Sequence, residues 1–372
     1  MYNQPWKLVP NRVRGRGGRE IDKLRGVYPP VDDNSGSEAW IGSVTHAANA
    51  SPDKPHLGCA EVIMPDGKRM YLFEAIALSP REILGEKHFK KHGNNLGVLI
   101  KYLDAKTDYG LQAHPTRPFA KKMWGSDFGK EESWYVIGIR DDMPPPGIIL
   151  GFKEGVTRKA WEELYFKDDL EGLKNLCHTI PVQVGDCFFV GGGVPHALGA
   201  GCFVIEVQEP CDITVVPVTQ RKQMERFARN HPNNTGSGVP AFMREKEEIY
   251  NEKSLGTFVY DGCSEEENLR RWRIPHKTIR EDFYGKEFFL IGPEQTSYFS
   301  FTRLDLKGST PLRNTGSPQV GIVLKGEGRI NFDGGSMPVR QGDEIFFPYN
   351  LPGAAAEGEL SLILCHPEGA DC

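Results

Sequence analysis

A short motif occurs twice in the chain, and it constrains the fold more than any other feature. Residues 185–190 read GDCFFV and residues 342–347 read GDEIFF, and a Pro-Val pair precedes both copies, at 181–182 and 338–339. Gly-Asp before an apolar run is typical of a turn that leads into a strand, so one copy alone would carry little weight. Two copies in the same context predict a duplicated β-domain.

The residues around these copies also favour strands over long helices. Glycine and proline, 42 and 27 of the 372 residues, break helices and argue against a helical bundle or a coiled coil. Short apolar runs, such as those at 133–139 and 202–208, are bounded by turn residues and predict strands. Residues 1–120 read as strands and loops with at most one helix. Thr157 is a candidate N-cap for one or two short helices, and 228–240 reads as a loop.

Charge and composition exclude several classes of protein. The chain has 45 basic and 50 acidic side chains, a formal net charge of −5, which argues against a globally basic nucleic-acid-binding protein. No apolar run approaches the about 18 residues of a membrane span, and the N-terminus lacks the apolar stretch of a signal peptide. The eight cysteines include no C-x-x-C pair. We therefore expect a cytoplasmic protein with reduced thiols that binds neither nucleic acid nor membrane.

Four polar residues could together form a metal site. Gln112 and His114 are two residues apart in YGLQAHP, so on a strand their side chains would point to the same side. His196 follows a glycine-rich turn in GGGVPHALG, and Glu132 stands at the head of a predicted strand. Two imidazoles, a carboxylate and an amide oxygen are a plausible ligand set for Zn²⁺ or a similar divalent ion. Spacing alone leaves open that both histidines are ordinary surface or core residues.

Several ordered segments resemble a known family. Residues 185–196 read G-x5-G-x-G-x-x-H, close to the second cupin motif, with Gly191 where proline is usual. IKYLDAKTDYGLQAHP at 100–115, GKEESWYVI at 129–137 and FVIEVQEPCDITV at 203–215 resemble segments of the type I mannose-6-phosphate isomerases. GGREID, SEAWIGS and GGGVPHALG are similar to that family too. The blocks follow one another in order, so the resemblance is more specific than any one of them.

The resemblance implies a mainly β fold with two cupin-type, jelly-roll β-barrel domains and helical insertions. We expect a metal-binding N-terminal domain at 1–218, with a short helical insertion near 157–178. A connecting segment of helices and loops at 219–275 would lead to a C-terminal cupin-like domain at 276–372. In that second copy Gly353 stands at the position of the motif histidine, which implies a domain that binds no metal.

The resemblance also implies an activity. The family interconverts mannose 6-phosphate and fructose 6-phosphate by ring opening and proton transfer between C1 and C2 through an enediol. One Zn²⁺ or other divalent ion per chain would be held by Gln112, His114, Glu132 and His196. The ion would stabilise negative charge on the substrate oxygens. The expected partner is a small phosphosugar.

Further residues are candidates for proton transfer and for binding the sugar. Glu206, on the strand FVIEVQE, is the first candidate for the catalytic base, and Lys130 beside Glu132 is the second. Gln208 lies on the same face as Glu206 and could bind sugar hydroxyls. An ion pair at the edge of a strand is an equally open interpretation of Glu206.

The phosphate end of the site departs from the family. A phosphate needs cations, and Lys101 is the first candidate by resemblance, with Arg117 and Arg221 as further options. Val216 stands where the family usually has an arginine, and Gly110 replaces a serine before the metal-binding glutamine. Either Arg221 substitutes for that arginine or the activity is altered. Two alternatives therefore stay open: an isomerase of another sugar, and a non-catalytic, sugar-binding regulatory cupin.

Overall fold

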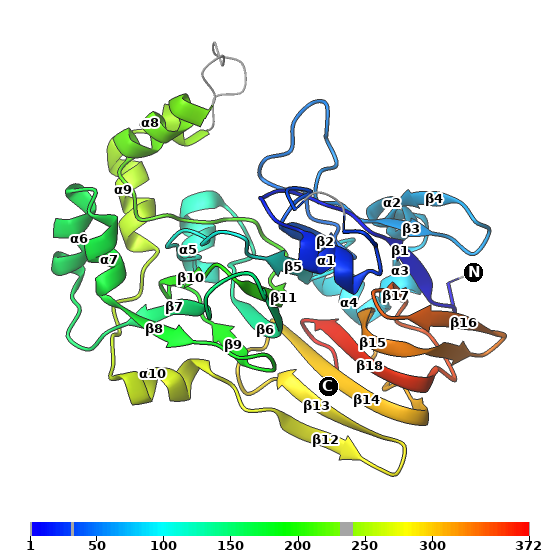
Figure 1. The fold of residues 1–372 in the computed structure, drawn as a ribbon. Helices are drawn as coiled ribbons and strands as arrows, with labels where there is room; N and C mark the ends of the chain where they lie inside the picture. Colours follow the sequence, from blue (N-terminus) through cyan, green and yellow to red (C-terminus); the bar gives the residue numbers. More distant parts are fainter. Residues whose placement is uncertain (1, 31–32, 231–240, 372) are drawn as a thin grey trace.

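Strands dominate the molecule, as the sequence predicts (Figure 1). The computed structural model describes residues 2–30, 33–230 and 241–371. In this part of the chain the strands form sheets of ten, five and three strands. None of the described helices has the length and apolar character that crossing a membrane requires.

The five-stranded sheet is the central layer. Its order is β2-β5-β11-β6-β9, and the three-stranded sheet has the order β10-β7-β8. The bounds are β2 (Glu38–Ile41), β5 (Leu99–Asp104), β6 (Glu132–Ile139), β7 (Gly147–Phe152), β8 (Cys177–Pro181), β9 (Cys187–Val190), β10 (His196–Leu198) and β11 (Cys202–Gln208). Trp134, Phe188 and Val204 on one face of the central layer share an apolar cluster with Ile148 and Leu198 of the smaller sheet. The candidate site described below lies between the five-stranded and the three-stranded sheet, next to this apolar cluster.

The other face of the central layer packs on the ten-stranded sheet. Ile100 and Ile205 share a cluster there with Phe301 and Phe346 of the C-terminal strands. These strands are β12 (Lys277–Glu281), β13 (Gly285–Ile291), β14 (Phe299–Pro311), β15 (Gln319–Phe332), β16 (Gly335–Arg340), β17 (Glu344–Phe347) and β18 (Ala355–Pro367). Alternation along each strand therefore gives the central layer one largely apolar face and one face that also carries charged groups.

Three N-terminal strands extend the C-terminal sheet, next to β17 (Figure 1). They are β1 (Trp6–Val9), β3 (Glu61–Ile63) and β4 (Arg69–Tyr71). Trp6 pairs with Phe346 across the antiparallel ladder between β1 and β17. The division of the chain at residues 218 and 276 stays a prediction, and the first strand of the chain pairs across it.

The two copies of the repeated motif form the same structure. Gly185 and Gly342 both have positive φ, +96° and +86°, which glycine adopts without strain. Each donates its N–H to a carbonyl of the neighbouring strand at 2.8 Å. The carboxylates of Asp186 and Asp343 each accept the N–H three residues upstream at 2.9 Å. Both motifs lead into a strand, β9 and β17, which supports the predicted duplication.

The prediction of at most one helix in residues 1–120 was wrong. The structure has α1 (Arg19–Leu24), α2 (Leu72–Leu78), α3 (Pro80–Leu84), α4 (Glu86–His92) and, from residue 117, α5 (Arg117–Trp124). Each has only five to eight residues. One or two turns are too short to show a helical period, and these helices are stabilised by packing of side chains such as Ile76 and Ile83 in the core.

The helices predicted after Thr157 are confirmed. Thr157 caps α6 (Arg158–Phe166) by accepting the N–H of Ala160 at 3.2 Å, and α7 (Leu170–Asn175) follows. The connecting segment holds α8 (Gln220–Asn230), η1 (Ala241–Arg244), α9 (Glu247–Gly256) and α10 (Glu265–Trp272). The predicted loop at 228–240 lies outside the described residues apart from its first three, which end α8.

Candidate metal centre and active site

Three side chains from distant parts of the sequence meet between the sheets. His114 precedes α5, Glu132 begins β6 and His196 begins β10. Their ligand atoms all lie within 4.8 Å of one another, and all three side chains are fully buried. Nε2 of His114 is 3.0 Å from Glu132 Oε2, and Nε2 of His196 is 3.4 Å from Glu132 Oε1. Gln112 joins them, with its side-chain amide 3.2 Å from His196 Nε2.

Backbone carbonyls fix the tautomer of both histidines. Nδ1 of His114 is 2.9 Å from the carbonyl oxygen of Ile213, and Nδ1 of His196 is 2.9 Å from that of Val194. A carbonyl oxygen can only accept, so each Nδ1 carries the hydrogen. Each Nε2 therefore presents a lone pair toward the carboxylate of Glu132. This is the arrangement that orients metal-ligating histidines in proteins.

The ligand atoms of this cluster are suited to bind a divalent cation. Two imidazole nitrogens that carry no hydrogen face a carboxylate, and Glu132 Oε1 has no hydrogen-bond partner among the described residues. Burial lowers the pKa of His114 to about 4 and also lowers that of His196, so both are neutral at pH 7. Burial raises the pKa of Glu132, but the nearby Lys130 ammonium and histidines bring it well below its usual range. Neutral nitrogens and a carboxylate fit a divalent ion such as Zn²⁺.

Lys130 lies at the edge of this cluster. Its Nζ is 2.6 Å from His114 Nε2 and 2.7 Å from Glu132 Oε2, and its side chain is almost completely buried. The amine of Lys130 is thereby held beside the candidate ligand atoms.

A row of paired residues crosses the central sheet beside the cluster. Trp40, Lys101, Glu206 and Trp134 lie directly opposite one another on β2, β5, β11 and β6. Lys101 Nζ is 2.8 Å from Glu206 Oε1, and Trp134 Nε1 donates to Glu206 Oε2 at 3.2 Å. Glu132 is two residues before Trp134 and so shares this face. Lys101, Glu206 and the candidate metal ligand Glu132 thus share the face that looks toward the smaller sheet.

Gln208 occupies the next position along β11 on the same face. It lies opposite Glu132, and its Nε2 donates to the carbonyls of Glu209 and Cys211 at 2.9 and 2.6 Å. Its Oε1 is buried and has no hydrogen-bond partner among the described residues. The amide orientation is fixed, and one acceptor remains free to receive a hydroxyl.

The two predicted arginines are paired elsewhere. Arg221 lies on α8 with 70% of its side chain exposed and forms ion pairs with Asp168 and Glu225, outside the cluster. Arg117 begins α5 and forms ion pairs with two carboxylates. Glu209, directly after β11, is 2.6 Å away, and Glu368, directly after β18, is 3.0 Å away.

Sequence reasoning missed Arg14, whose guanidinium lies close to the row. Arg14 binds Asp212 through two bonds of 2.7 and 2.8 Å and Glu38 through a third of 3.0 Å. Arg14 and Lys101 both lie over the ring of Trp40, at 5.4 and 5.1 Å from its centre. Burial raises the pKa of Asp212, but Arg14 and Lys101 bring it down to about 2. The only signal in the sequence is that Asp212 lies in one of the family-like blocks.

Comparison with known proteins supports the same family. A model of the mannose-6-phosphate isomerase cupin domain matches residues 292–367. Mannose-6-phosphate isomerase ManA of Bacillus subtilis is 28% identical over 275 residues, which cover 74% of this chain and 76% of that protein. The mannose-6-phosphate isomerase of Streptococcus mutans is 25% identical over 291 residues, which cover 77% and 80%.

Solved structures share the fold along almost the whole chain. The crystal structure of the mannose 6-phosphate isomerase from Bacillus subtilis superposes with a TM-score of 0.72 at 23% identity, over 97% of this chain and 99% of that one. A zinc-bound mannose 6-phosphate isomerase gives a TM-score of 0.70 at 13% identity, over 98% and 99%. These findings confirm the cupin-type fold and the resemblance to the type I mannose-6-phosphate isomerases.

Proposed function

We propose that this chain is a metal-dependent mannose-6-phosphate isomerase that interconverts mannose 6-phosphate and fructose 6-phosphate through an enediol. The observation that carries the proposal is the buried convergence of His114, Glu132 and His196, with Gln112 beside them, in a chain whose relatives bear this name. These four residues would hold one Zn²⁺ or similar ion per chain. The ion would stabilise the negative charge that develops on the substrate oxygens.

Glu206 is the first candidate for the base that moves the proton between C1 and C2. Lys101 at 2.8 Å and the indole N–H of Trp134 at 3.2 Å orient its carboxylate on the face that carries Glu132. A base must lie within hydrogen-bond reach of the proton that it takes. A carboxylate whose orientation is already fixed loses less entropy when it reaches that geometry. Lys130, held beside the ligand atoms, is the second candidate.

The remaining candidates bind the ends of the substrate. Gln208 offers its free Oε1 to a sugar hydroxyl, and Lys101 is the first candidate for the phosphate. Arg117 is a weaker one, because two carboxylates already neutralise it. Arg221, exposed on α8, is the weakest. The substrate class is a small phosphosugar, and we propose a cytoplasmic location.

The test is an assay that couples formation of fructose 6-phosphate from mannose 6-phosphate to a reporter. We expect activity that a chelator removes and Zn²⁺ restores, with one ion per chain by metal analysis. Protein that holds its metal and does not turn over mannose 6-phosphate would contradict the proposal. Turnover of a different aldose instead would favour an isomerase of another sugar.

Two variants separate metal binding from proton transfer. His114→Ala should lose bound metal and activity together, because it removes one ligand from a four-residue set. Glu206→Gln keeps the size of the side chain and should keep the metal while kcat falls by about 10²- to 10⁴-fold, the usual contribution of a general base. A Glu206→Gln enzyme with wild-type kcat would leave Glu206 as a structural partner of Lys101.

A further inference from the structure

The backbone that presents Glu132 is pinned just before β6. Residues 129–132 lead into this strand and carry both Lys130 and the metal-binding carboxylate. The N–H of Lys130 donates to the carbonyl of Pro115 at 3.0 Å. The N–H of Glu131 donates to a side chain, the carboxylate of Glu209, at 3.1 Å. The position of Glu132 therefore depends on what holds residues 129–131.

One support comes directly from the C-terminal sheet. Thr296 lies between β13 and β14, and its Oγ1 donates to Glu131 Oε2 at 2.7 Å. The same Oγ1 accepts the N–H of Tyr298 at 3.1 Å, which fixes the hydroxyl from the other side. Thr296 is buried, so water cannot readily replace this bond.

A second support is relayed through Arg117. Its Nε donates at 2.6 Å to Glu209, the residue whose other oxygen holds the Glu131 N–H. Its Nη2 donates at 3.0 Å to Glu368, directly after β18, and its guanidinium lies 3.5 Å from the centre of the Tyr298 ring. A planar guanidinium with two bonds and a ring contact has one orientation. The C-terminal sheet therefore also fixes the carboxylate that holds the Glu131 N–H.

We propose that Thr296, Tyr298 and Glu368 are positioning residues for the metal centre, acting on residues 129–132 through Glu131 and Arg117. The C-terminal sheet then has a direct part in the site, although the copy of the motif that it contains has Gly353 where a ligand histidine would stand. None of the three touches a ligand atom. The effect on turnover rests on the proposed function, whereas the effect on metal affinity does not.

The sharpest test compares two replacements of Thr296 in the full-length chain. Thr296→Val keeps the shape and removes the hydroxyl, while Thr296→Ser keeps the hydroxyl. We expect Thr296→Val to weaken Zn²⁺ binding by about 10-fold in competition with a chelator, the lower end of the effect of residues that support ligands. Its kcat for mannose 6-phosphate should fall while KM stays within about twofold, and Thr296→Ser should restore wild-type values on both readouts.

A matched control lies on the same sheet. Lys307 and Glu359 form an ion pair with about three quarters of each side chain exposed, so Glu359→Gln should change neither Zn²⁺ affinity nor kcat. Tyr298→Leu and Tyr298→Phe form a second pair, in which only phenylalanine keeps the ring over Arg117.

Two results would overturn the positioning role. One is wild-type Zn²⁺ affinity in both Thr296→Val and Tyr298→Leu. The other is equal loss in Thr296→Val and Thr296→Ser, because the hydroxyl would then not be the cause. If Thr296→Val fails to fold, Tyr298→Leu and Tyr298→Phe take its place. Wild-type Zn²⁺ affinity in Tyr298→Leu, or an equal loss of affinity in both variants, would then overturn the positioning role. A wild-type protein that binds Zn²⁺ without isomerase activity contradicts the proposed function alone, and the affinity comparison still tests the positioning role.

Discussion

Arg14 and Arg221 are the two candidates to replace the arginine that the resembled family usually has at the position of Val216. Arg14 shares the ring of Trp40 with Lys101 and holds Asp212, whereas Arg221 is paired on the surface of α8. Asp212 precedes Ile213, whose carbonyl orients His114, so Arg14 also supports a candidate metal ligand. The residue that compensates for Val216 should therefore be Arg14.

Single replacements distinguish the two arginines. We expect Arg14→Ala to lower kcat/KM for mannose 6-phosphate by at least about 10-fold, because it leaves the buried Asp212 carboxylate without its two-bond partner. Arg221→Ala should stay within about twofold, since exposed ion pairs contribute about 0–1 kcal/mol. Steady-state kinetics of both variants decide the question. The opposite order of effects would make Arg221 the compensating residue.

The same residues show what the sequence could and could not predict about the site. His114, Glu132 and His196 could be named as candidate ligands because His114 shares a predicted strand face with Gln112 and His196 follows a glycine-rich turn, and the structure does bring them together. Arg14 and Asp212 are 198 positions apart, and neither has a spacing that distinguishes it from a surface charge. Their pairing is a product of the fold, so no local pattern could reveal it.

At the scale of elements, strands were easier to predict than helices. Apolar runs of strand length lie between turn residues, so β6, β7 and β11 stand out in the sequence. Helices α1 to α5 are too short to show a period and form because the chain around them packs. The arrangement of the elements needs long-range contacts, such as the pairing of β1 with β17, which no window of the sequence contains.

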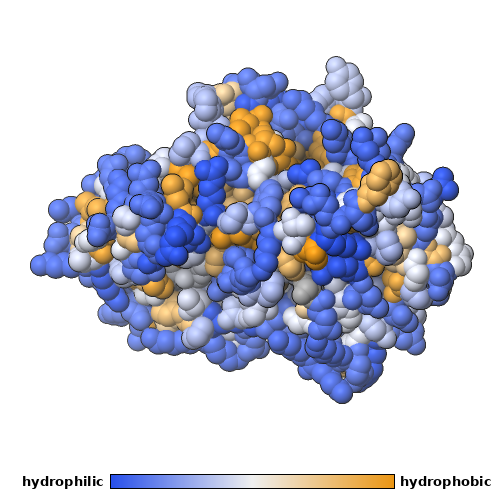
Figure 2. Space-filling view, turned by 90° about the horizontal axis from the view of Figure 1, so that it is seen from below, coloured by the Kyte–Doolittle hydropathy of each residue, from blue (hydrophilic) through white to orange (hydrophobic). Residues whose placement is uncertain are grey.

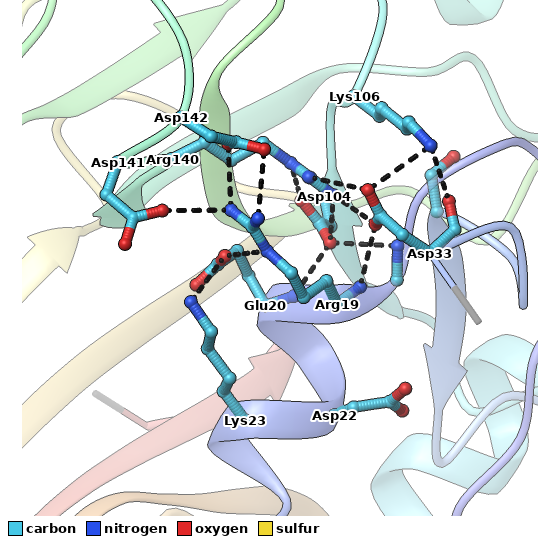
Figure 3. A network of polar contacts seen from close by, with 12 residues as sticks. Arg19, Glu20, Asp22, Lys23, Asp33, Asp104, Lys106, Arg140, Asp141 and Asp142 are labelled. Carbon is cyan, nitrogen blue, oxygen red and sulfur yellow. Dashed lines mark hydrogen bonds and ion pairs between the residues drawn. The ribbon is translucent and has the colours of Figure 1, made fainter. Parts of the chain in front are cut away.

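A buried ion pair fastens α1 to the central sheet (Figure 3). Arg140, directly after β6, binds Asp104 at the end of β5 through two bonds of 2.7 and 2.8 Å. The same carboxylate accepts the N–H groups of Gly18 and Glu20 at the start of α1, at 2.8 and 2.9 Å. One carboxylate therefore joins two strands and a helix.

Removing that carboxylate should destabilise the protein strongly. Asp104→Ala leaves the guanidinium of Arg140 buried with a single partner, Asp33, and we expect a loss of about 3–5 kcal/mol of unfolding free energy. Glu359→Gln, on the exposed pair with Lys307, should cost at most about 1 kcal/mol. Denaturant unfolding of both variants measures the two values. Equal values would mean that the pair at Asp104 contributes no more than a surface pair.

At the scale of the whole molecule, the C-terminal sheet is joined to the N-terminal part of the chain by strand pairing as well as by packing. It supplies the far side of the apolar layer under the central sheet and pairs with the first strand of the chain. On the face seen from below, apolar residues form small, separate patches among hydrophilic ones (Figure 2). Because one apolar cluster joins the central sheet to the C-terminal sheet, we expect these two sheets to unfold together, in a single transition.

The fold also buries the side chains of His366 and His92. Burial lowers the pKa of His366 to about 3 and of His92 to about 4, from about 6.5 in an unfolded chain. Neither ring nitrogen of His366 has a hydrogen-bond partner among the described residues. Between pH 6.5 and pH 4 the unfolded state therefore binds more protons than the folded state. The contribution of these two histidines to the unfolding free energy is therefore fully present above pH 6.5. It decreases as the pH falls toward their folded-state pKa values.

The contribution of His366 can be isolated by His366→Leu. Each such histidine makes stability fall by up to about 1.4 kcal/mol per pH unit in this window, so the variant should have a shallower acid limb than the wild type. Denaturant unfolding at pH 8, 6, 5 and 4.5 gives the slopes. At pH 8 both side chains are neutral, and the difference there measures packing alone and serves as the reference. Parallel acid limbs would show that His366 takes up its proton equally in both states, which its burial and the nearby Arg313 guanidinium argue against.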